Sequence, residues 1–301
     1  MHVKLGMHLS SLTMSREGLK LNTSQKIKIA AIQVKSVPRD KDTNLQRALE
    51  YIEHMGEQQA DLVIFPELYL TGYTADKDFF KLSESVPGQT THTLAKYAAK
   101  FNVNVIMGMP TLSRLYPNIV YNSAVFINPE GVIQVYNKTH LATVFAEGVR
   151  FQEGLFFKCG REYPVFDTKI GRIGILICMD ALLPEPARIL AAKGAELIVG
   201  IFAAPKPFRK RVELLCRARA AENGVAFVVC NNVGVQDNVD FFGGSMIINS
   251  NGDVDACGKY NEEDVVIGNV DFEEIRRFRS NFAWLRDRRP WTYGELCEYI
   301  E

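Results

Sequence analysis

The stretch Gly171-Arg-Ile-Gly-Ile-Leu-Ile-Cys-Met-Asp180 carries a short apolar run that ends at a cysteine. Residues 173–177 are almost all aliphatic, and such a run behind a glycine is typical of a strand buried on both faces. Two prolines then mark a turn, and residues 185–193 predict a helix with proline in its first turn. Cys178 is therefore expected on a strand-to-helix turn.

A thiol at such a turn is a candidate nucleophile. It lies near backbone N–H groups and the positive end of a helix, and both favour the thiolate over the thiol. The alternative is that Cys178 is a small buried apolar side chain, as most free cysteines are. This stretch by itself leaves both interpretations open.

The composition excludes several classes of function. The chain has 301 residues, of which 47% are hydrophobic and 23% charged, as is ordinary for a globular protein. The formal net charge is zero, so a general role in binding nucleic acid or an acidic membrane has no electrostatic support. No apolar run approaches the length of a membrane span, and the first 25 residues lack the apolar core of a secretory signal.

The cysteines and histidines point to a reducing compartment and away from a metal site. None of the six cysteines forms a C-x-x-C pair and several lie inside apolar runs, which indicates reduced thiols in the cytoplasm. The five histidines show no spacing typical of metal ligands. We therefore expect no bound metal.

The order of the predicted elements is doubled along the chain. A strand-helix-strand-helix pattern occurs before about residue 110 and again after about residue 170, with hairpins between and after. Two sheets, each with helices on one face, account for this order. The sequence thus predicts an N-terminal extension over residues 1–25 and a single α/β domain over residues 26–301. The predicted strands are 26–34, 61–65, 104–108, 120–127, 131–136, 163–168, 173–177, 196–202, 225–230, 245–249 and 264–271, and the predicted helices are 42–59, 90–100, 185–193, 208–223 and 272–279.

Three polar residues share the same local context. Glu67, Lys138 and Cys178 each stand at or just beyond the end of a predicted strand. Side chains from distant parts of a chain converge on one pocket at such strand ends. Taken alone, Glu67 could be a solvated carboxylate at a strand end, and Lys138 could be a lysine in a loop. Only the combination of the three residues indicates a catalytic site.

The stretches around these residues resemble the nitrilase superfamily of carbon–nitrogen hydrolases. The match extends from about Lys26 to the C-terminal tail. The stretches that carry it are Phe65-Pro-Glu-Leu68 with Thr71-Gly-Tyr73, Tyr136-Asn-Lys-Thr-His-Leu141, Gly171 to Asp180 with Pro184-Glu-Pro-Ala-Arg188, Arg217-Ala-Arg-Ala-Ala-Glu-Asn223, Asn231-Asn-Val-Gly234, and Gly244-Ser-Met-Ile-Ile-Asn-Ser-Asn-Gly252.

The resemblance implies a four-layer αββα sandwich and a Glu-Lys-Cys triad formed by Glu67, Lys138 and Cys178. It also implies a second glutamate near the triad, and Glu147 matches that position through its spacing from the Phe151-Gln-Glu-Gly154 turn. Members of the family usually pair, so we expect a homodimer or a higher homo-oligomer. The helix with Ile189-Leu-Ala-Ala192 is the expected contact.

These residues suffice for hydrolysis without a metal or an organic cofactor. Glu67 can take the thiol proton of Cys178, which then attacks an amide carbonyl or a nitrile carbon. Lys138 and the backbone N–H of Met179 can stabilise the developing negative charge.

Three further residues flank the expected site. His140 invites a Cys–His interpretation, but we expect it to be a structural, hydrogen-bonded histidine. Lys206 and Arg209 belong to a basic run that follows a predicted strand. The run fits a solvated helix start, or alternatively a site for a substrate carboxylate.

The sequence therefore predicts a hydrolase that releases ammonia from a small amide or N-carbamoyl compound. True nitrilases of this superfamily usually carry an aromatic residue and Glu after the cysteine, whereas Met179 and Asp180 follow here, which favours the amidase branch. The alternatives are a nitrilase that acts on a small nitrile, an acyl transferase with the same residues, and a non-catalytic binding protein on the same fold.

Overall fold

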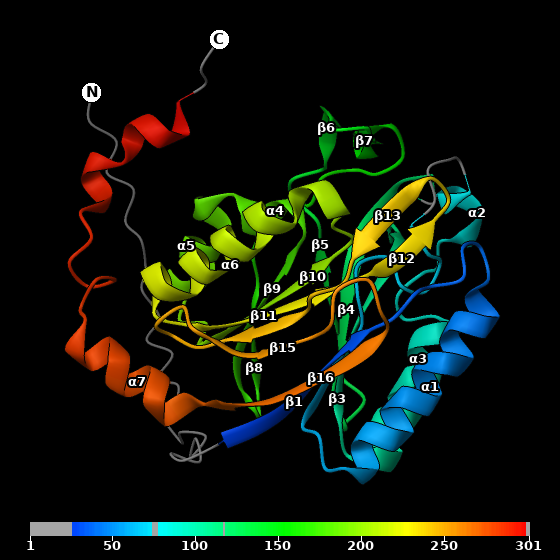
Figure 1. Ribbon diagram of the computed structural model, residues 1–301, viewed down its shortest axis with the longest axis horizontal. Helices are drawn as coiled ribbons and strands as arrows, with labels where there is room; N and C mark the ends of the chain where they lie inside the picture. Colours follow the sequence, from blue (N-terminus) through cyan, green and yellow to red (C-terminus); the bar gives the residue numbers. More distant parts are fainter. Residues whose placement is uncertain (1–25, 74–77, 117, 299–301) are drawn as a thin grey trace, which may run out of the picture.

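Two six-stranded sheets pack face to face, and helices cover the outer face of each sheet (Figure 1). The computed structural model describes residues 26–73, 78–116 and 118–298, so the expected extension over residues 1–25 lies outside the described residues. This arrangement confirms the four-layer αββα sandwich.

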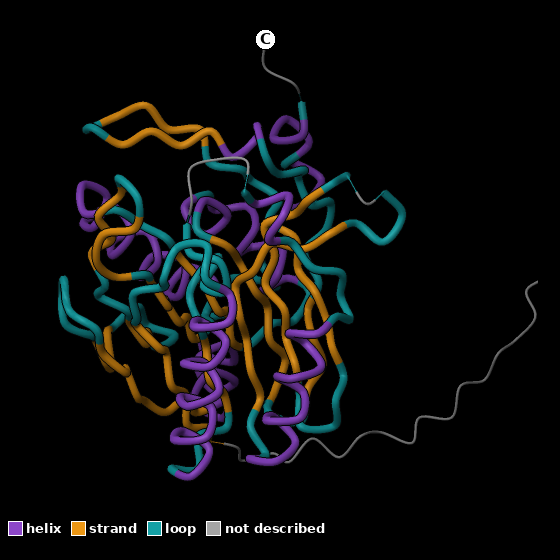
Figure 2. The backbone as a smooth tube through the Cα atoms, turned by 90° about the vertical axis from the view of Figure 1, so that its right-hand side faces the viewer, coloured by secondary structure: helices purple, strands orange, loops and turns teal. Residues whose placement is uncertain are grey.

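The first sheet has the strand order β16-β1-β2-β3-β4-β5. Strands β1, β2 and β3 run parallel, and the remaining neighbours pair antiparallel. Helices α1 (Lys41–Glu57) and α3 (Gln89–Phe101) lie side by side over its outer face (Figure 2). The strand bounds are β1 Lys26–Gln33, β2 Leu62–Ile64, β3 Asn104–Leu112, β4 Val120–Ile127, β5 Ile133–Asn137 and β16 Asp264–Asp271.

The second sheet has the order β15-β14-β11-β10-β9-β8 and is covered by three helices. These are α4 (Met179–Leu182), α5 (Pro184–Ala192) and α6 (Arg209–Asn223), while α7 (Phe272–Asn281) follows β16. The strand bounds are β8 Val165–Thr168, β9 Gly171–Ile177, β10 Leu197–Phe202, β11 Ala226–Asn231, β14 Met246–Ile248 and β15 Val254–Cys257.

Strand β9 shows why the apolar run folds as a central strand. Ile175 packs into the core between the two sheets, and Leu176 packs into the core beneath α5 and α6. Gly174 lies directly under Leu190 of α5, since a Cβ atom there would approach Leu190 Cδ1 to 2.7 Å. The helix can therefore pack closely on the strand whose end carries Cys178.

Several short elements were not predicted from the sequence. The hairpin of β6 (Thr143–Ala146) and β7 (Val149–Gln152) projects at the top of Figure 1, near α2 (Phe79–Leu82) and the hairpin of β12 (Val233–Gln236) and β13 (Val239–Phe242). Their strands are four residues long, too short for a clear alternation of apolar and polar residues. The short 3₁₀ helices are Glu153–Leu155, Lys206–Phe208, Pro290–Thr292 and Gly294–Cys297.

Among the described residues, no helix is both long enough and apolar enough to cross a bilayer.

Candidate active site

Cys178 lies between β9 and α4 with an unusual backbone conformation. Its φ is 45° and its ψ is −99°, which costs a non-glycine residue roughly 1–3 kcal/mol and is frequent at functional sites. The backbone N–H of Cys178 donates to the Ile201 carbonyl of β10 at 2.9 Å. The strand-to-helix turn expected from the sequence is therefore present, and it is held to the neighbouring strand.

Glu67 is fully buried just beyond the end of β2. Its Oε1 accepts hydrogen bonds from Lys138 Nζ at 2.6 Å and Asn122 Nδ2 at 2.8 Å, and its Oε2 accepts from the Ala203 N–H at 2.8 Å. Strand β3 leaves room for this turn only because residue 108 is glycine. A Cβ atom at Gly108 would lie 2.2 Å from the Pro66 carbonyl oxygen.

Lys138 follows β5, and its ammonium group lies between two buried carboxylates. Besides Glu67, Nζ contacts Glu153, whose Oε1 and Oε2 lie 2.9 Å and 2.8 Å away. The backbone of Lys138 is fixed as well, since its N–H donates to the Asn122 carbonyl and its carbonyl accepts from the Gly160 N–H. This lysine therefore has a defined position as well as a partner of opposite charge.

Glu153 begins the 3₁₀ helix after β7 and is also buried. Its Oε2 accepts from the Ala142 N–H at 2.7 Å, and its Oε1 accepts from the Tyr73 hydroxyl at 3.0 Å. Glu67, Lys138 and Glu153, which we call the buried charge cluster, thus form a continuous hydrogen-bonded group without bulk water.

Burial and neighbouring charges shift the pKa values of Glu67 and Lys138. Burial raises the pKa of the Glu67 carboxyl, Lys138 opposes this, and Glu153 reinforces it. Burial lowers the pKa of Lys138, but the charges of Glu153 and Glu67 outweigh burial and raise the pKa overall. Lys138 is therefore a permanent cation beside a carboxyl that holds its proton more tightly than usual.

The Cys178 thiol lies within the field of this cluster. Burial raises its pKa well above the usual value, Glu67 raises it further, Lys138 opposes the rise, and the Ala203 N–H contributes a hydrogen bond that also lowers it. The expectation that the turn favours the thiolate is therefore wrong. Burial and the charge of Glu67 raise the pKa of the thiol more than Lys138 and the Ala203 N–H lower it.

Comparison with known proteins identifies the family. The sequence matches the family Carbon-nitrogen hydrolase over residues 28–280. The chain belongs to the carbon–nitrogen hydrolase family.

Individual relatives agree with this membership. The chain is 34% identical over 276 residues to "Probable nitrilase C965.09" of Schizosaccharomyces pombe, covering 90% of this chain and 98% of the relative. It is 31% identical over 289 residues to "Omega-amidase NIT3" of Saccharomyces cerevisiae, covering 91% and 97%. The crystal structure of S. cerevisiae Nit3, described as a member of the nitrilase superfamily, matches with a TM-score of 0.79 at 29% identity over 88% of this chain and 97% of that one. These matches confirm the resemblance inferred from the motifs.

Within this hydrolase fold, the structure does not bring Glu147 to the buried charge cluster. Glu147 is exposed in the turn between β6 and β7, and Glu153 lies beside Lys138 instead. Glu147 and Gly148 both have positive φ, at 52° and 77°, as the two-residue turn of a tight hairpin requires. Both glutamates stand two residues after a phenylalanine, so only the folded chain separates them: Phe151 is buried, whereas Phe145 is exposed.

The Tyr136-Asn-Lys-Thr-His-Leu141 motif also contains His140, which is hydrogen-bonded in the structure. His140 Nδ1 lies 3.0 Å from Asp180 Oδ1 and 3.2 Å from the Tyr163 hydroxyl, and its ring stacks on that of Tyr163. The expectation of a hydrogen-bonded histidine is confirmed.

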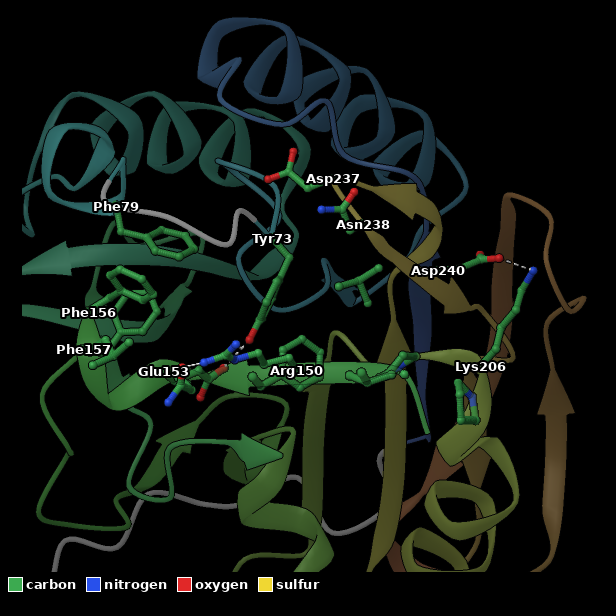
Figure 3. A pocket seen from close by; sticks show the side chains of 18 residues that line it. Tyr73, Phe79, Arg150, Glu153, Phe156, Phe157, Lys206, Asp237, Asn238 and Asp240 are labelled. Carbon is green, nitrogen blue, oxygen red and sulfur yellow. Dashed lines mark hydrogen bonds and ion pairs between the residues drawn. The ribbon is translucent and has the colours of Figure 1, made fainter. Parts of the chain in front are cut away.

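A cavity of about 560 Å³ reaches the buried charge cluster (Figure 3). Glu153 and Tyr73, which are hydrogen-bonded to each other, belong both to its wall and to the surroundings of Lys138. Phe79, Phe156 and Phe157 form an aromatic part of the wall, seen at the left of Figure 3. Cys178 itself is partly exposed and does not line this cavity.

The two basic residues expected to contact substrate are placed differently. Lys206 lines the cavity, with its Nζ 2.6 Å from Asp240 Oδ2 (Figure 3). Arg209 lines a neighbouring cleft of about 440 Å³, whose wall also includes Lys206, and it lies over the Tyr260 ring. Of the pair, only Lys206 faces the cavity beside the charge cluster.

Proposed function

We propose that this chain hydrolyses the terminal carbon–nitrogen bond of a small amide or N-carbamoyl compound through a thioester on Cys178, releasing ammonia. Membership of the carbon–nitrogen hydrolase family supports hydrolysis of a bond of this kind. The observation that carries the proposal is the Ala203 N–H, which donates to Glu67 Oε2 and also lowers the pKa of Cys178. It links the proposed base to the proposed nucleophile.

In the first half of the reaction, the Glu67 carboxylate takes the proton of the Cys178 thiol as sulfur attacks the carbonyl carbon. The raised pKa of Cys178 makes its thiol a weaker acid, and the raised pKa of Glu67 makes its carboxylate a stronger base, so the two shifts offset each other in this proton transfer. The negative charge that develops on oxygen is stabilised by Lys138 and by the Met179 N–H, which has no acceptor within its helix because Met179 is the first residue of α4. Glu67 then returns its proton to the nitrogen, the carbon–nitrogen bond breaks, and ammonia leaves.

In the second half, water attacks the thioester while Glu67 again accepts a proton. The carbon–sulfur bond breaks, the acid product leaves, and the thiol of Cys178 is restored. Glu153 keeps the ammonium of Lys138 charged and aligned through both halves. We therefore assign the assisting role expected of a second glutamate to Glu153.

The proposed substrate carries a primary amide or a carbamoyl group, because its nitrogen can leave after protonation by Glu67. A nitrile offers no such leaving group in the first step. Nitrile hydrolysis is nevertheless the second candidate, because one relative is named a nitrilase and another an omega-amidase. Asp180 in place of the Glu that usually follows the cysteine of a nitrilase favours the amide.

A panel of four compounds tests the substrate class. Ammonia release is measured from propionamide, 4-carbamoylbutanoate, N-carbamoyl-β-alanine and propionitrile. The proposal expects turnover of an amide or carbamoyl compound and at most trace turnover of the nitrile. Turnover of propionitrile that exceeds that of every amide would overturn the assignment.

The Cys178→Ala variant tests the nucleophile. It removes one sulfur atom at the end of a strand, so the fold should persist while ammonia release falls to the level of a protein-free control. Cys216→Ala is the matched control, because Cys216 is buried on the core-facing side of α6 and belongs neither to the charge cluster nor to the Cys178 turn. If Cys178→Ala remained active, the thioester route would be wrong. Failure of wild type to form a Cys178 adduct with a reactive amide such as fluoroacetamide would favour a non-catalytic binding protein.

We also propose a homodimer or higher homo-oligomer, located in the cytoplasm. The exposed apolar side chains of Ile189 on α5 and Leu214 on α6 support a contact between copies on this helical face. All six cysteines are free thiols, which is consistent with a reducing compartment. A monomer by light scattering at micromolar concentration would contradict the assembly.

A further inference from the structure

We propose that Asp180 is a positioning residue that fixes the Cys178 turn against the Lys138 loop. This inference rests on the proposed function, since it assigns a role in aligning the nucleophile with the cation. Asp180 contributes no atom to the bonds that form and break.

The carboxylate of Asp180 is fully buried and accepts four hydrogen bonds. Oδ2 accepts from the Tyr136 hydroxyl at 2.7 Å and from the Ile177 N–H at 3.2 Å. Oδ1 accepts from the His140 N–H at 2.8 Å and contacts His140 Nδ1 at 3.0 Å.

The donors lie on both sides of the two reactive residues. Ile177 directly precedes Cys178, while Tyr136 and His140 stand two residues before and two residues after Lys138. One rigid carboxylate therefore connects the nucleophile turn to the lysine loop, which come from different sheets.

The Cys178 turn is held to β10 by its bond to Ile201 and to α6 by Arg219, and Asp180 adds the contact that ties it to the Lys138 loop. The positive φ of Cys178 is unfavourable, and α4 is too short to hold the turn by its own hydrogen bonds. Lys138, by contrast, is fixed by the buried charge cluster and by the backbone bonds of its loop. Without Asp180, the lysine would keep its place while the thiol could shift relative to it, and misplacement by about 1 Å is enough to cost on the order of 100-fold in rate.

Asp180→Asn is the test variant because it preserves shape but turns one acceptor oxygen into a donor. Its amide N–H₂ must face either the backbone N–H of Ile177 or that of His140, so at least one hydrogen bond of the anchor is lost. We expect kcat for the best amide of the panel to fall by at least about tenfold while KM changes by less than about threefold.

A second readout separates positioning from simple loss of stability. The rate at which iodoacetamide alkylates Cys178, followed by mass spectrometry of the peptide that contains it, should fall in parallel with kcat, since both need the thiol aligned with Glu67. Glu196→Gln is the matched control. Glu196 is a buried carboxylate paired with Arg276 at 2.7 Å, and it precedes β10 at the end of the sheet away from Cys178.

Tyr136→Phe keeps the test decisive if Asp180→Asn does not fold. It removes a single donor and leaves the carboxylate with three, so a smaller loss in kcat and in the alkylation rate is expected. Unchanged kcat and alkylation in both variants would overturn the inference, as would an equal loss in Glu196→Gln. Measuring Cys178→Ala in parallel separates failure of this inference from failure of the proposed function. If Cys178→Ala is active, the proposed function is wrong. If Cys178→Ala is inactive while Asp180→Asn has normal activity, only the role of Asp180 is wrong.

Discussion

Two groups of charged residues lie near the cavity, and they differ in how far they are removed from water. In the buried charge cluster, Lys138 and its two carboxylate partners are at most 3% exposed, and every contact is 2.9 Å or shorter. At the rim, Lys206 and Asp240 also approach to 2.6 Å, but their side chains are 44% and 42% exposed. Contact distance alone does not distinguish the two groups.

The difference shows that burial decides what an ion pair does. Exposed pairs contribute roughly 0–1 kcal/mol because water screens them. Buried charges are costly to isolate, and here Glu153 and Lys138 both change the pKa of Glu67, while the two glutamates raise the pKa of Lys138. We therefore expect large effects from substitutions in the cluster and small ones from matched substitutions at the rim.

Lys138→Met should have the largest effect of the matched substitutions. It removes the cation that stabilises the developing oxyanion, so kcat should fall by about 100- to 1000-fold or more. It also leaves two carboxylates facing each other, which costs roughly 3–5 kcal/mol of folding free energy unless one of them takes up a proton. Ammonia release per folded molecule and thermal unfolding measure the two effects, and a kcat within tenfold of wild type would remove Lys138 from the mechanism.

Comparing Glu153→Gln with Glu147→Gln tests the same substitution at a buried and at an exposed glutamate. Glu153 makes charge-assisted hydrogen bonds to Lys138, and each such bond contributes about 1.5–3 kcal/mol. If the loss of one bond raises the activation free energy by this amount, kcat should fall by about 10- to 100-fold. Glu147 is exposed on a hairpin turn, so its substitution should leave kcat and stability unchanged. The reverse ranking in ammonia release would restore Glu147 as the assisting glutamate.

The pH dependence provides a further test of the cluster. Glu67 acts as base only when ionised, and its pKa is raised above the model-compound value of 4.5. Activity should therefore be lost as the pH falls through a midpoint above 4.5, and it should persist into alkaline solution because the pKa of Lys138 is raised as well. Glu153→Gln removes a charge that raises the pKa of Glu67, so the acid limb of kcat/KM should move to lower pH. A shift to higher pH would contradict this electrostatic account.

The sequence singled out Glu67, Lys138 and Cys178 through the motifs shared with the family and through their places near the ends of predicted strands, and their catalytic roles stay a proposal. Cys178 and Lys138 directly follow β9 and β5, and Glu67 comes three residues after β2. The sheet arrangement followed from the same strands.

What the sequence could not give is the geometry of the short elements at the rim. Strands β6 and β7 are too short for a periodic signal, so spacing alone did not separate Glu147 from Glu153. The pKa of Cys178 was mispredicted because the burial of its thiol and the nearby charge of Glu67 are known only from the folded chain. The contact of Lys206 with Asp240 likewise depends on how β13 folds over the cavity.

Lys206→Met should have the smallest effect, and it tests whether the rim recognises substrate. Because Lys206 faces the cavity and its bond to Asp240 is exposed, a substrate carboxylate can compete for the ammonium group. A partly exposed charged contact is worth about 1 kcal/mol, so KM for 4-carbamoylbutanoate should rise by roughly fivefold while KM for the neutral propionamide stays constant. Arg209→Met, outside this cavity, should change neither value. If both substrates lost affinity equally, Lys206 would only support the fold of the rim, and if Arg209→Met alone raised KM, the carboxylate would bind in the neighbouring cleft.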